Sequence, residues 1–218
     1  MIKLVIFDLD GTLLDTIGDL SAACDAVLNA RRLPRHTWDG YRRMVGNGIR
    51  RLVERALPES MRDDATIESV REQFVEYYID HIDVHTRPYD GIAEVVGQLA
   101  ERGVKLAVVS NKFQAGTEKL IRRFFGDTEF LAVYGQREGV PLKPDPQVDF
   151  EIMRMAEADA SEVLHIGDSS VDIATAKAAG VRSVGVVWGF RPREEIVAAG
   201  ADFVAESAAD ILKIVEKL

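Results

Sequence analysis

Two aspartates stand one residue apart near the start of the chain, directly after a run of apolar residues. The run covers residues 4–7, and Asp8, Asp10 and Gly11 follow it. If the run is a strand of a parallel sheet, its carboxyl end lies at a ligand crevice, and a turn at Gly11 directs both carboxylates into that opening. Gathered carboxylates repel one another unless a cation is present, and a hard, partly hydrated oxygen site favours Mg²⁺. The alternative is a simple turn, since Asp and Gly are common turn residues.

Two later segments place polar residues after an apolar run or in a stiff loop. Ser110 and Asn111 follow residues 104–109. A phosphate oxygen could accept hydrogen bonds from Ser110 and from backbone N–H groups there, or these side chains could simply cap the next helix. Lys143 lies in a loop with prolines at positions 144 and 146, which restrict the backbone. A restrained ammonium can hold a phosphate oxygen and a carboxylate together, although isolated Lys-Pro loops are usually solvated.

A second pair of aspartates follows the apolar run at residues 163–166. Asp168 stands at the expected strand end, and Asp172 lies in the first turn of a helix that ends before Gly180. A positive φ at the end of a helix explains Gly180, and Asp172 could merely complement the helix dipole. Asp168 has no such simple explanation. Together the four segments converge on one crevice, and this convergence outweighs the separate structural explanations.

The elements that must position these residues alternate between apolar runs and helical patterns. The apolar runs cover residues 4–7, 104–109, 163–166 and 181–187, with weaker ones at 130–133 and 202–205. Helical patterns cover residues 92–102, 117–124, 146–156, 170–179 and 208–217. This alternation predicts a doubly wound, Rossmann-like α/β fold with a parallel sheet.

One interval interrupts the alternation. From residue 16 to residue 86 the patterns are helical, with candidate helices at 19–31, 38–44, 49–56 and 67–85 and no strand. We expect residues 1–14 and 87–218 to form the α/β catalytic core, and residues 15–86 to form a helical cap domain inserted after the first strand. Such a cap can close over the crevice and exclude water.

The composition restricts the class of partner. The chain has 218 residues and a formal net charge of −9, which argues against a nucleic-acid or anionic-membrane binder. A single cysteine, Cys24, cannot form an intramolecular disulfide, as is typical of a reducing compartment. We find no secretory or membrane-spanning pattern. A cytoplasmic location, as a monomer or homodimer, is the expectation.

The four segments, in this order, resemble the motifs of the haloacid dehalogenase-like hydrolase superfamily, specifically its phosphoglycolate phosphatase-like branch. The motifs are Asp8–Thr12, Ser110 with Asn111, the Lys143–Pro146 loop, and Gly167–Asp168 with Asp172. The resemblance covers essentially the whole chain and is much less specific for substrate than for superfamily.

The resemblance implies a mechanism. Asp8 is the expected nucleophile, which forms an aspartyl-phosphate, and Asp10 the general acid and then base. Mg²⁺ is expected on the Asp8 side chain, the Asp10 main-chain carbonyl and Asp168. Phosphate is expected to contact Lys143, Ser110 with Asn111, and Thr12, whose alternative role is that of a turn residue. Asp172 is expected to orient Asp168 or Lys143.

Two further segments are candidates for substrate contact. The segment around Asn47 resembles the cap of phosphoglycolate phosphatases, and its flanking glycines would let backbone N–H groups approach a small carboxylate. Arg50 belongs to the densest basic cluster of the chain and is a substrate-binding candidate, although a solvated helix face explains most of that cluster. The segment 188–191 resembles a loop beside the active site, or could anchor the core through its aromatic residues.

The most favoured substrate is 2-phosphoglycolate, within the class of small anionic phosphate esters. The same machinery could act on a sugar phosphate, a nucleotide or pyrophosphate, or perform a β-phosphoglucomutase-like phosphomutase reaction. A non-catalytic, phospho-accepting receiver-like switch is the alternative from another class. Receivers are usually near half this length and lack a helical insertion, so this alternative is the weakest.

Overall fold

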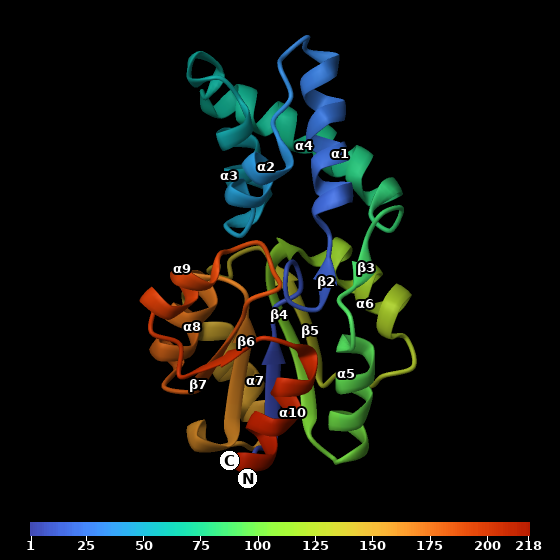
Figure 1. The fold of residues 1–218 in the computed structure, drawn as a ribbon. Coiled ribbons are helices and arrows are strands. Elements are labelled where there is room, and N and C mark those ends of the chain that lie inside the picture. The colour runs from blue at the N-terminus through green and yellow to red at the C-terminus, as the bar shows by residue number, and fades with distance from the viewer.

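The computed structural model describes all 218 residues and is built around a six-stranded parallel sheet (Figure 1). The strand order is β5-β4-β1-β6-β7-β8. The strands are β1 (Leu4–Phe7), β4 (Lys105–Phe113), β5 (Ala132–Gln136), β6 (Val163–Gly167), β7 (Arg182–Val186) and β8 (Phe203–Ala205). The predicted doubly wound α/β fold is confirmed.

Helices cover both faces of the sheet because its strands are apolar on both sides. In β1, Val5 and Phe7 join the larger core, whereas Leu4 and Ile6 join the smaller one. The helices on the larger core are α5 (Ile92–Glu101), α6 (Gln114–Phe125) and α10 (Ala208–Lys217). Residues of α7 (Gln147–Ala156) and α8 (Ser170–Ala179) line the smaller core, and the short α9 (Arg193–Ala198) packs Ile196 against Gly185 of β7. No helix combines the length and low polarity needed to cross a bilayer.

The second core strand extends four residues beyond its expected end. We expected it to stop at residue 109, but β4 continues to Phe113. Its pairing with β5 shifts register between Val109 and Phe113 and resumes at the pair Phe113–Gln136. This irregularity places Ser110–Lys112 in extended backbone. The suggestion that Ser110 or Asn111 caps the next helix is therefore wrong, since the N-cap of α6 is Phe113.

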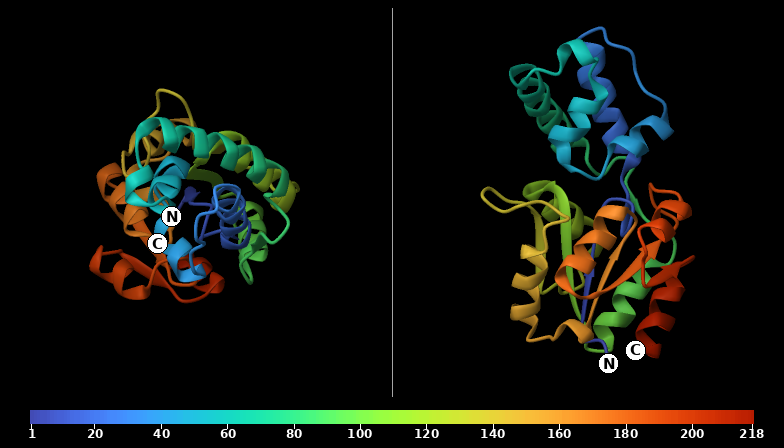
Figure 2. Two further views of the ribbon diagram at one scale, coloured as in Figure 1. Left: turned by 90° about the horizontal axis from the view of Figure 1, so that it is seen from above. Right: turned by 90° about the vertical axis from the view of Figure 1, so that its left-hand side faces the viewer.

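Four helices form a separate layer beyond the carboxyl ends of the sheet strands (Figures 1 and 2). They are α1 (Ile17–Ala30), α2 (Trp38–Met44), α3 (Gly48–Ala56) and α4 (Asp64–His81). In α4 the buried residues Ile67, Val70, Phe74 and Tyr78 are three or four apart, so they form one apolar stripe. We call the segment 15–86 the cap. Both chain termini lie at the opposite end of the molecule from the cap.

Two short strands and one buried aspartate connect the cap to the core. Strand β2 (Leu14–Asp15) pairs antiparallel with β3 (Arg87–Pro88), so the expected boundary between residues 14 and 15 falls inside β2. Asp19 of α1 is 1% exposed and accepts hydrogen bonds from the backbone N–H groups of His85 and Thr86 and from the Thr86 hydroxyl, at 2.7–3.0 Å. This carboxylate therefore ties the outgoing connection to the returning one.

We predict that Asp19→Ala destabilises the protein by about 2 to 4 kcal/mol. The substitution leaves two buried Thr86 donors without a partner, and each such group costs about 1–3 kcal/mol. Urea unfolding, with the exposed Asp80→Ala in α4 as control, measures the loss. A change below about 1 kcal/mol would show that the connection does not depend on Asp19.

Candidate active site

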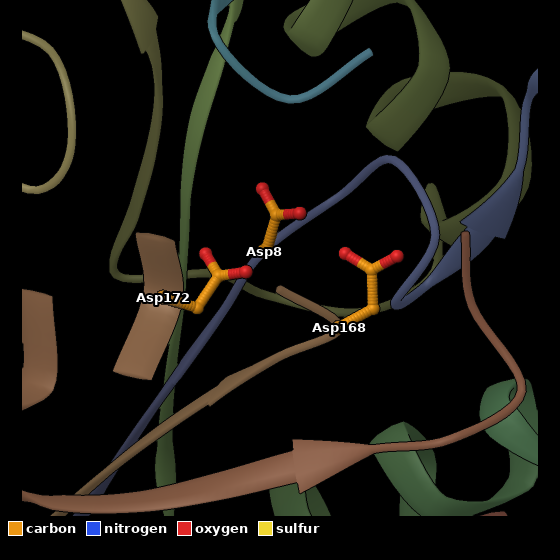
Figure 3. Close-up of side chains that lie close together, drawn as sticks. All are labelled: Asp8, Asp168 and Asp172. Atoms are coloured by element: carbon orange, nitrogen blue, oxygen red, sulfur yellow. The ribbon is translucent and has the colours of Figure 1, made fainter. Parts of the chain in front are cut away.

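The carboxyl ends of β1, β4 and β6 meet at one cavity between core and cap. Asp8 follows β1, Ser110 lies in β4, Asp168 follows β6, and Lys143 lies in the loop before α7. The cavity encloses about 590 Å³, part of it open to solvent, and its lining includes these four residues. We call it the aspartate cavity. Asp8, Asp168 and Asp172 gather there (Figure 3), with one oxygen of each within 4.8 Å of the others.

A buried ammonium joins two of these carboxylates. Lys143 Nζ donates to Asp8 Oδ1 at 2.8 Å and to Asp172 Oδ1 at 2.7 Å. Burial favours the neutral amine, but the charges of Asp172 and Asp8 outweigh it and raise the pKa of Lys143. Burial and the charge of Asp172 raise the pKa of Asp8 to about 6, against the opposing effect of Lys143. The ammonium stays charged, and it fixes the orientation of the Asp8 carboxylate.

Asp172 is fully engaged by protein donors. Its Oδ1 accepts from Lys143, and its Oδ2 accepts from the backbone N–H and the hydroxyl of Ser169 in a capping box at the start of α8. Burial opposes ionisation of Asp172, yet the Lys143 charge and His165 together bring its pKa below the ordinary value. Of the two partners considered from sequence, Asp172 contacts Lys143 and not Asp168 in the structure.

Asp168 is buried without an ionic partner. Its Oδ2 accepts from the Phe190 backbone N–H at 2.6 Å, and burial together with the charges of Asp172 and Asp8 raises its pKa well above the ordinary value. Two glycines make room for it, because a Cβ on Gly11 or Gly189 would lie 2.3 Å from an Asp168 atom. Gly11 also has φ +89°, a conformation that favours glycine.

The donor set fits a divalent cation. Asp8 Oδ2 and Asp168 Oδ1 accept no hydrogen bond, and both carboxylates line the aspartate cavity. Hard carboxylate oxygens are the ligands that Mg²⁺ selects. Since both oxygens of Asp172 are already occupied, Asp8 and Asp168 are the side chains left to hold the ion.

Asp10 is held by a lysine that sequence reasoning gave no role. Lys112 Nζ lies 2.9 and 3.2 Å from the two Asp10 oxygens and 2.7 Å from the hydroxyl of Tyr78, a cap residue on α4. The Thr16 hydroxyl also donates to Asp10 Oδ1, at 2.7 Å. The carboxylate of Asp10 is therefore fixed at the junction of core and cap by groups from both.

Asn111 connects the Lys143 loop to the cap. Its Oδ1 accepts from the Lys143 backbone N–H at 2.9 Å, while Nδ2 donates to the carbonyl of Lys143 at 3.1 Å and to that of Gly46 at 3.0 Å. The Ser110 hydroxyl lines the cavity and accepts only from Lys112 N, so its proton is free to be donated.

Two of the expected contacts lie elsewhere. Thr12 is fully buried and does not line the aspartate cavity, because the tight turn in which its N–H bonds to the Leu9 carbonyl buries it. Its own carbonyl accepts from Trp188 Nε1 at 3.1 Å. Arg50 pairs with the exposed Asp64 and lines a neighbouring polar hollow rather than the aspartate cavity. Neither side chain is placed at the aspartates in this structure.

Behind the site lies a buried ion pair that sequence reasoning missed. His165 of β6 and Asp149 of α7 are both 0% exposed, with His165 Nδ1 and Asp149 Oδ2 2.7 Å apart. His165 Nε2 lies 3.8 Å from Asp172 Oδ1. Burial lowers the pKa of His165, but the Asp149 charge and hydrogen bond outweigh it and raise that pKa to about 9. The available signal was a histidine inside the otherwise apolar run at residues 163–166.

We predict that replacing one member of the Asp149–His165 pair costs more than replacing both. A single Asp149→Leu or His165→Leu leaves a buried charge without its partner, which typically costs about 3–5 kcal/mol, whereas an apolar replacement of a whole pair is often neutral. Urea unfolding of both single variants and the double variant gives the comparison. A double variant as unstable as the worse single variant would contradict the pairing.

The pair also predicts the sign of a pH effect on stability. The pKa of His165 is about 9 in the folded protein and about 6.5 in an unfolded chain. Its stabilisation is therefore complete below pH 6.5 and is lost as the pH rises through about 9. The free energy of unfolding should fall more steeply over this window in the parent protein than in the double variant. Parallel pH profiles would show that His165 is neutral in the fold.

Comparison with known proteins identifies the family. The model of the haloacid dehalogenase-like hydrolase family matches residues 5–186. A phosphoglycolate phosphatase of Mesorhizobium japonicum is 38% identical over 192 residues, covering 87% of this chain and 85% of that protein. One of Vibrio parahaemolyticus is 34% identical, covering 98% and 96%.

The structural comparison agrees. The crystal structure of a predicted phosphoglycolate phosphatase from Haemophilus somnus superposes with a TM-score of 0.91 at 28% identity, covering 98% of this chain and 97% of that one. On the matched family model, these relatives and the aspartate cavity, the chain belongs to the haloacid dehalogenase-like hydrolase family, in its phosphoglycolate phosphatase-like branch.

Proposed function

We propose that this phosphatase hydrolyses a small phosphomonoester in two displacements at Asp8, with Mg²⁺ as cofactor. The observation that supports the proposal most is the placement of Asp8 between a buried ammonium and a buried, unpaired carboxylate. Lys143 orients one oxygen of Asp8, while the other oxygen accepts no hydrogen bond and faces the cavity that Asp168 shares. A carboxylate held in this way can serve as a nucleophile.

In the first displacement an Asp8 oxygen attacks phosphorus and the bond from phosphorus to the alkoxide oxygen breaks. Asp10, in its protonated form at this stage, gives its proton to the departing alkoxide and is left as a carboxylate. In the second, Asp10 takes a proton from a water molecule, which attacks the aspartyl-phosphate and releases inorganic phosphate. Lys112 and Thr16 hold Asp10 in place for both transfers.

Charge compensation of the phosphoryl group falls to residues that line the aspartate cavity. Lys143 and Ser110 both line the cavity, and we expect them to contact its oxygens, since such preorganised donors stabilise charge that spreads over these oxygens in the transition state. Mg²⁺, bound by Asp8, Asp168 and the Asp10 carbonyl, would supply further positive charge there.

The proposed substrate is 2-phosphoglycolate. Two relatives that match over most of the chain, those of Mesorhizobium japonicum and Vibrio parahaemolyticus, are phosphoglycolate phosphatases, and both the cap and the core contribute to the lining of the cavity. The cap contribution includes Gly46 and Gly48, which have no side chain of their own to fill the cavity.

The direct test is phosphate release from a panel of phosphomonoesters, with pyrophosphate added, in the presence of Mg²⁺ and in the presence of EDTA. The panel contains 2-phosphoglycolate, hexose phosphates, nucleoside monophosphates and pyrophosphate. We expect hydrolysis only with Mg²⁺ and the highest kcat/KM for 2-phosphoglycolate. A kcat/KM tenfold higher on a hexose phosphate would displace this substrate, and full activity in EDTA would remove the metal from the proposal.

We predict that Asp8→Asn lowers kcat by a factor on the order of 10⁴ or more, as expected for loss of a nucleophile, while the protein stays folded. Asp127→Asn, at an exposed position outside the cavity, is the matched control. Stereochemical analysis with a chirally labelled ester provides an independent measurement, since two displacements retain configuration at phosphorus. Near-normal turnover by Asp8→Asn, or inversion, would mean direct attack by water.

A further inference from the structure

Three cationic side chains line the aspartate cavity, and they differ in their partners. Lys143 and Lys112 each lie against carboxylates, at 2.8 and 2.9 Å respectively. Arg191 instead donates to two neutral carbonyls, those of Arg42 and Val45 in the cap, each at 2.5 Å. The nearest carboxylate oxygen, on Glu195, is 3.7 Å from its Nε. Arg191 is therefore the lining cation whose charge is least neutralised by the protein.

The backbone fixes Arg191 near Asp168. It directly follows Phe190, whose N–H donates to Asp168 Oδ2. The Arg191 side chain is only 13% exposed, so its charge is weakly screened by solvent. A guanidinium has five N–H donors; the two carbonyls take two of them, and three stay available.

In the cap, the residue next to the Arg191 side chain is Gly46, which also lines the aspartate cavity. Gly46 has φ +114°, and a Cβ there would lie 3.5 Å from an Arg191 guanidinium nitrogen. A side chain at this position would therefore occupy space next to the guanidinium. Gly46 and the Arg191 guanidinium therefore lie next to each other in the lining of the aspartate cavity.

We propose that Arg191 binds the carboxylate of the substrate and so determines the preference for phosphorylated acids over neutral phosphate esters. This inference rests on the proposed function and adds the residue that recognises the second anionic group. Guanidinium pairs with carboxylates through two parallel hydrogen bonds, which the three free donors permit. The same side chain donates to two carbonyls of the cap. Binding of the substrate carboxylate and the position of the cap therefore both depend on Arg191.

Arg50, the arginine that sequence considerations favoured for this role, is less suitable. Its side chain is 46% exposed and already paired with Asp64. It also lines the neighbouring hollow and not the aspartate cavity. Exposed charges of this kind contribute little binding energy.

The test compares two esters that differ in one group. 2-Phosphoglycolate carries the carboxylate, and 2-hydroxyethyl phosphate carries a neutral hydroxymethyl group in its place. The enzymes are the parent protein, Arg191→Gln, Arg191→Lys, Arg50→Gln and Arg193→Gln. Arg193 is a matched control, because it lies two residues away and is exposed in a pair with Glu206.

We expect Arg191→Gln to lower kcat/KM for 2-phosphoglycolate by about 30- to 1,000-fold, as for loss of one partner of a buried charge pair, mainly through KM. Loss of the two bonds to the cap carbonyls affects both esters alike, so the loss for 2-hydroxyethyl phosphate should be smaller by a factor of about 10 or more. Arg191→Lys should recover part of the preference, and Arg50→Gln and Arg193→Gln should keep it. Equal losses on both esters would mean that Arg191 only holds the cap, and collapse of the preference in Arg50→Gln would assign the role to Arg50; either result overturns the proposal.

Equilibrium binding of the two esters in the Asp8→Asn background repeats the comparison without turnover. Weaker binding of 2-phosphoglycolate alone on adding Arg191→Gln supports the proposal, and unchanged or equally weakened binding of both overturns it. If the parent protein hydrolyses both esters with equal kcat/KM, the carboxylate preference fails while the phosphatase function stands. If it releases phosphate from no ester of the panel, the proposed function fails and this inference fails with it.

Discussion

The site depends on one constraint, the need to keep several buried carboxylates ionised. Burial alone would protonate them, because an uncompensated charge in the interior is costly. The Lys143 ammonium supplies the compensating positive charge for both Asp8 and Asp172. Since Asp8 follows β1 and Asp172 lies in α8, the ammonium also ties three chain segments together. Asp168 has no such partner, so a divalent cation bound beside it would supply the positive charge that its ionised form lacks.

The cap is connected to the chemistry through the same kind of contact. Tyr78 from α4 bonds to Lys112, which in turn holds Asp10. From the opposite side, Arg191 of the core reaches two carbonyls of the cap. Asp10, which is proposed to transfer protons, and Arg191, which is proposed to recognise the substrate, are both core residues with contacts to the cap. Activity therefore depends on the core and the cap together.

The sequence was sufficient to predict the sheet and the site residues that directly follow its strands. A short apolar run followed by Asp8 or Asp168 predicts both the sheet and the edge where the carboxylates lie, because parallel strands direct their carboxyl ends to one side. The sequence was insufficient to predict features that depend on packing between residues far apart in the chain. The extension of β4 depends on its register with β5, and the Asp149–His165 pair joins a helix and a strand through contacts that no local pattern specifies. Likewise, whether an arginine reaches the cavity depends on the path of its loop, which separated Arg191 from Arg50.

The side-chain amide of Asn111 has a consequence for the catalytic cycle. It makes two hydrogen bonds to the Lys143 peptide units and one to the cap, at the Gly46 carbonyl. If the cap lifts to admit or release a ligand, the bond to Gly46 is the only one of these three Asn111 bonds that must break, and water can replace it at little cost. The lysine loop keeps both of its bonds throughout. Entry and exit can therefore proceed against a phosphate pocket that retains its shape from one turnover to the next.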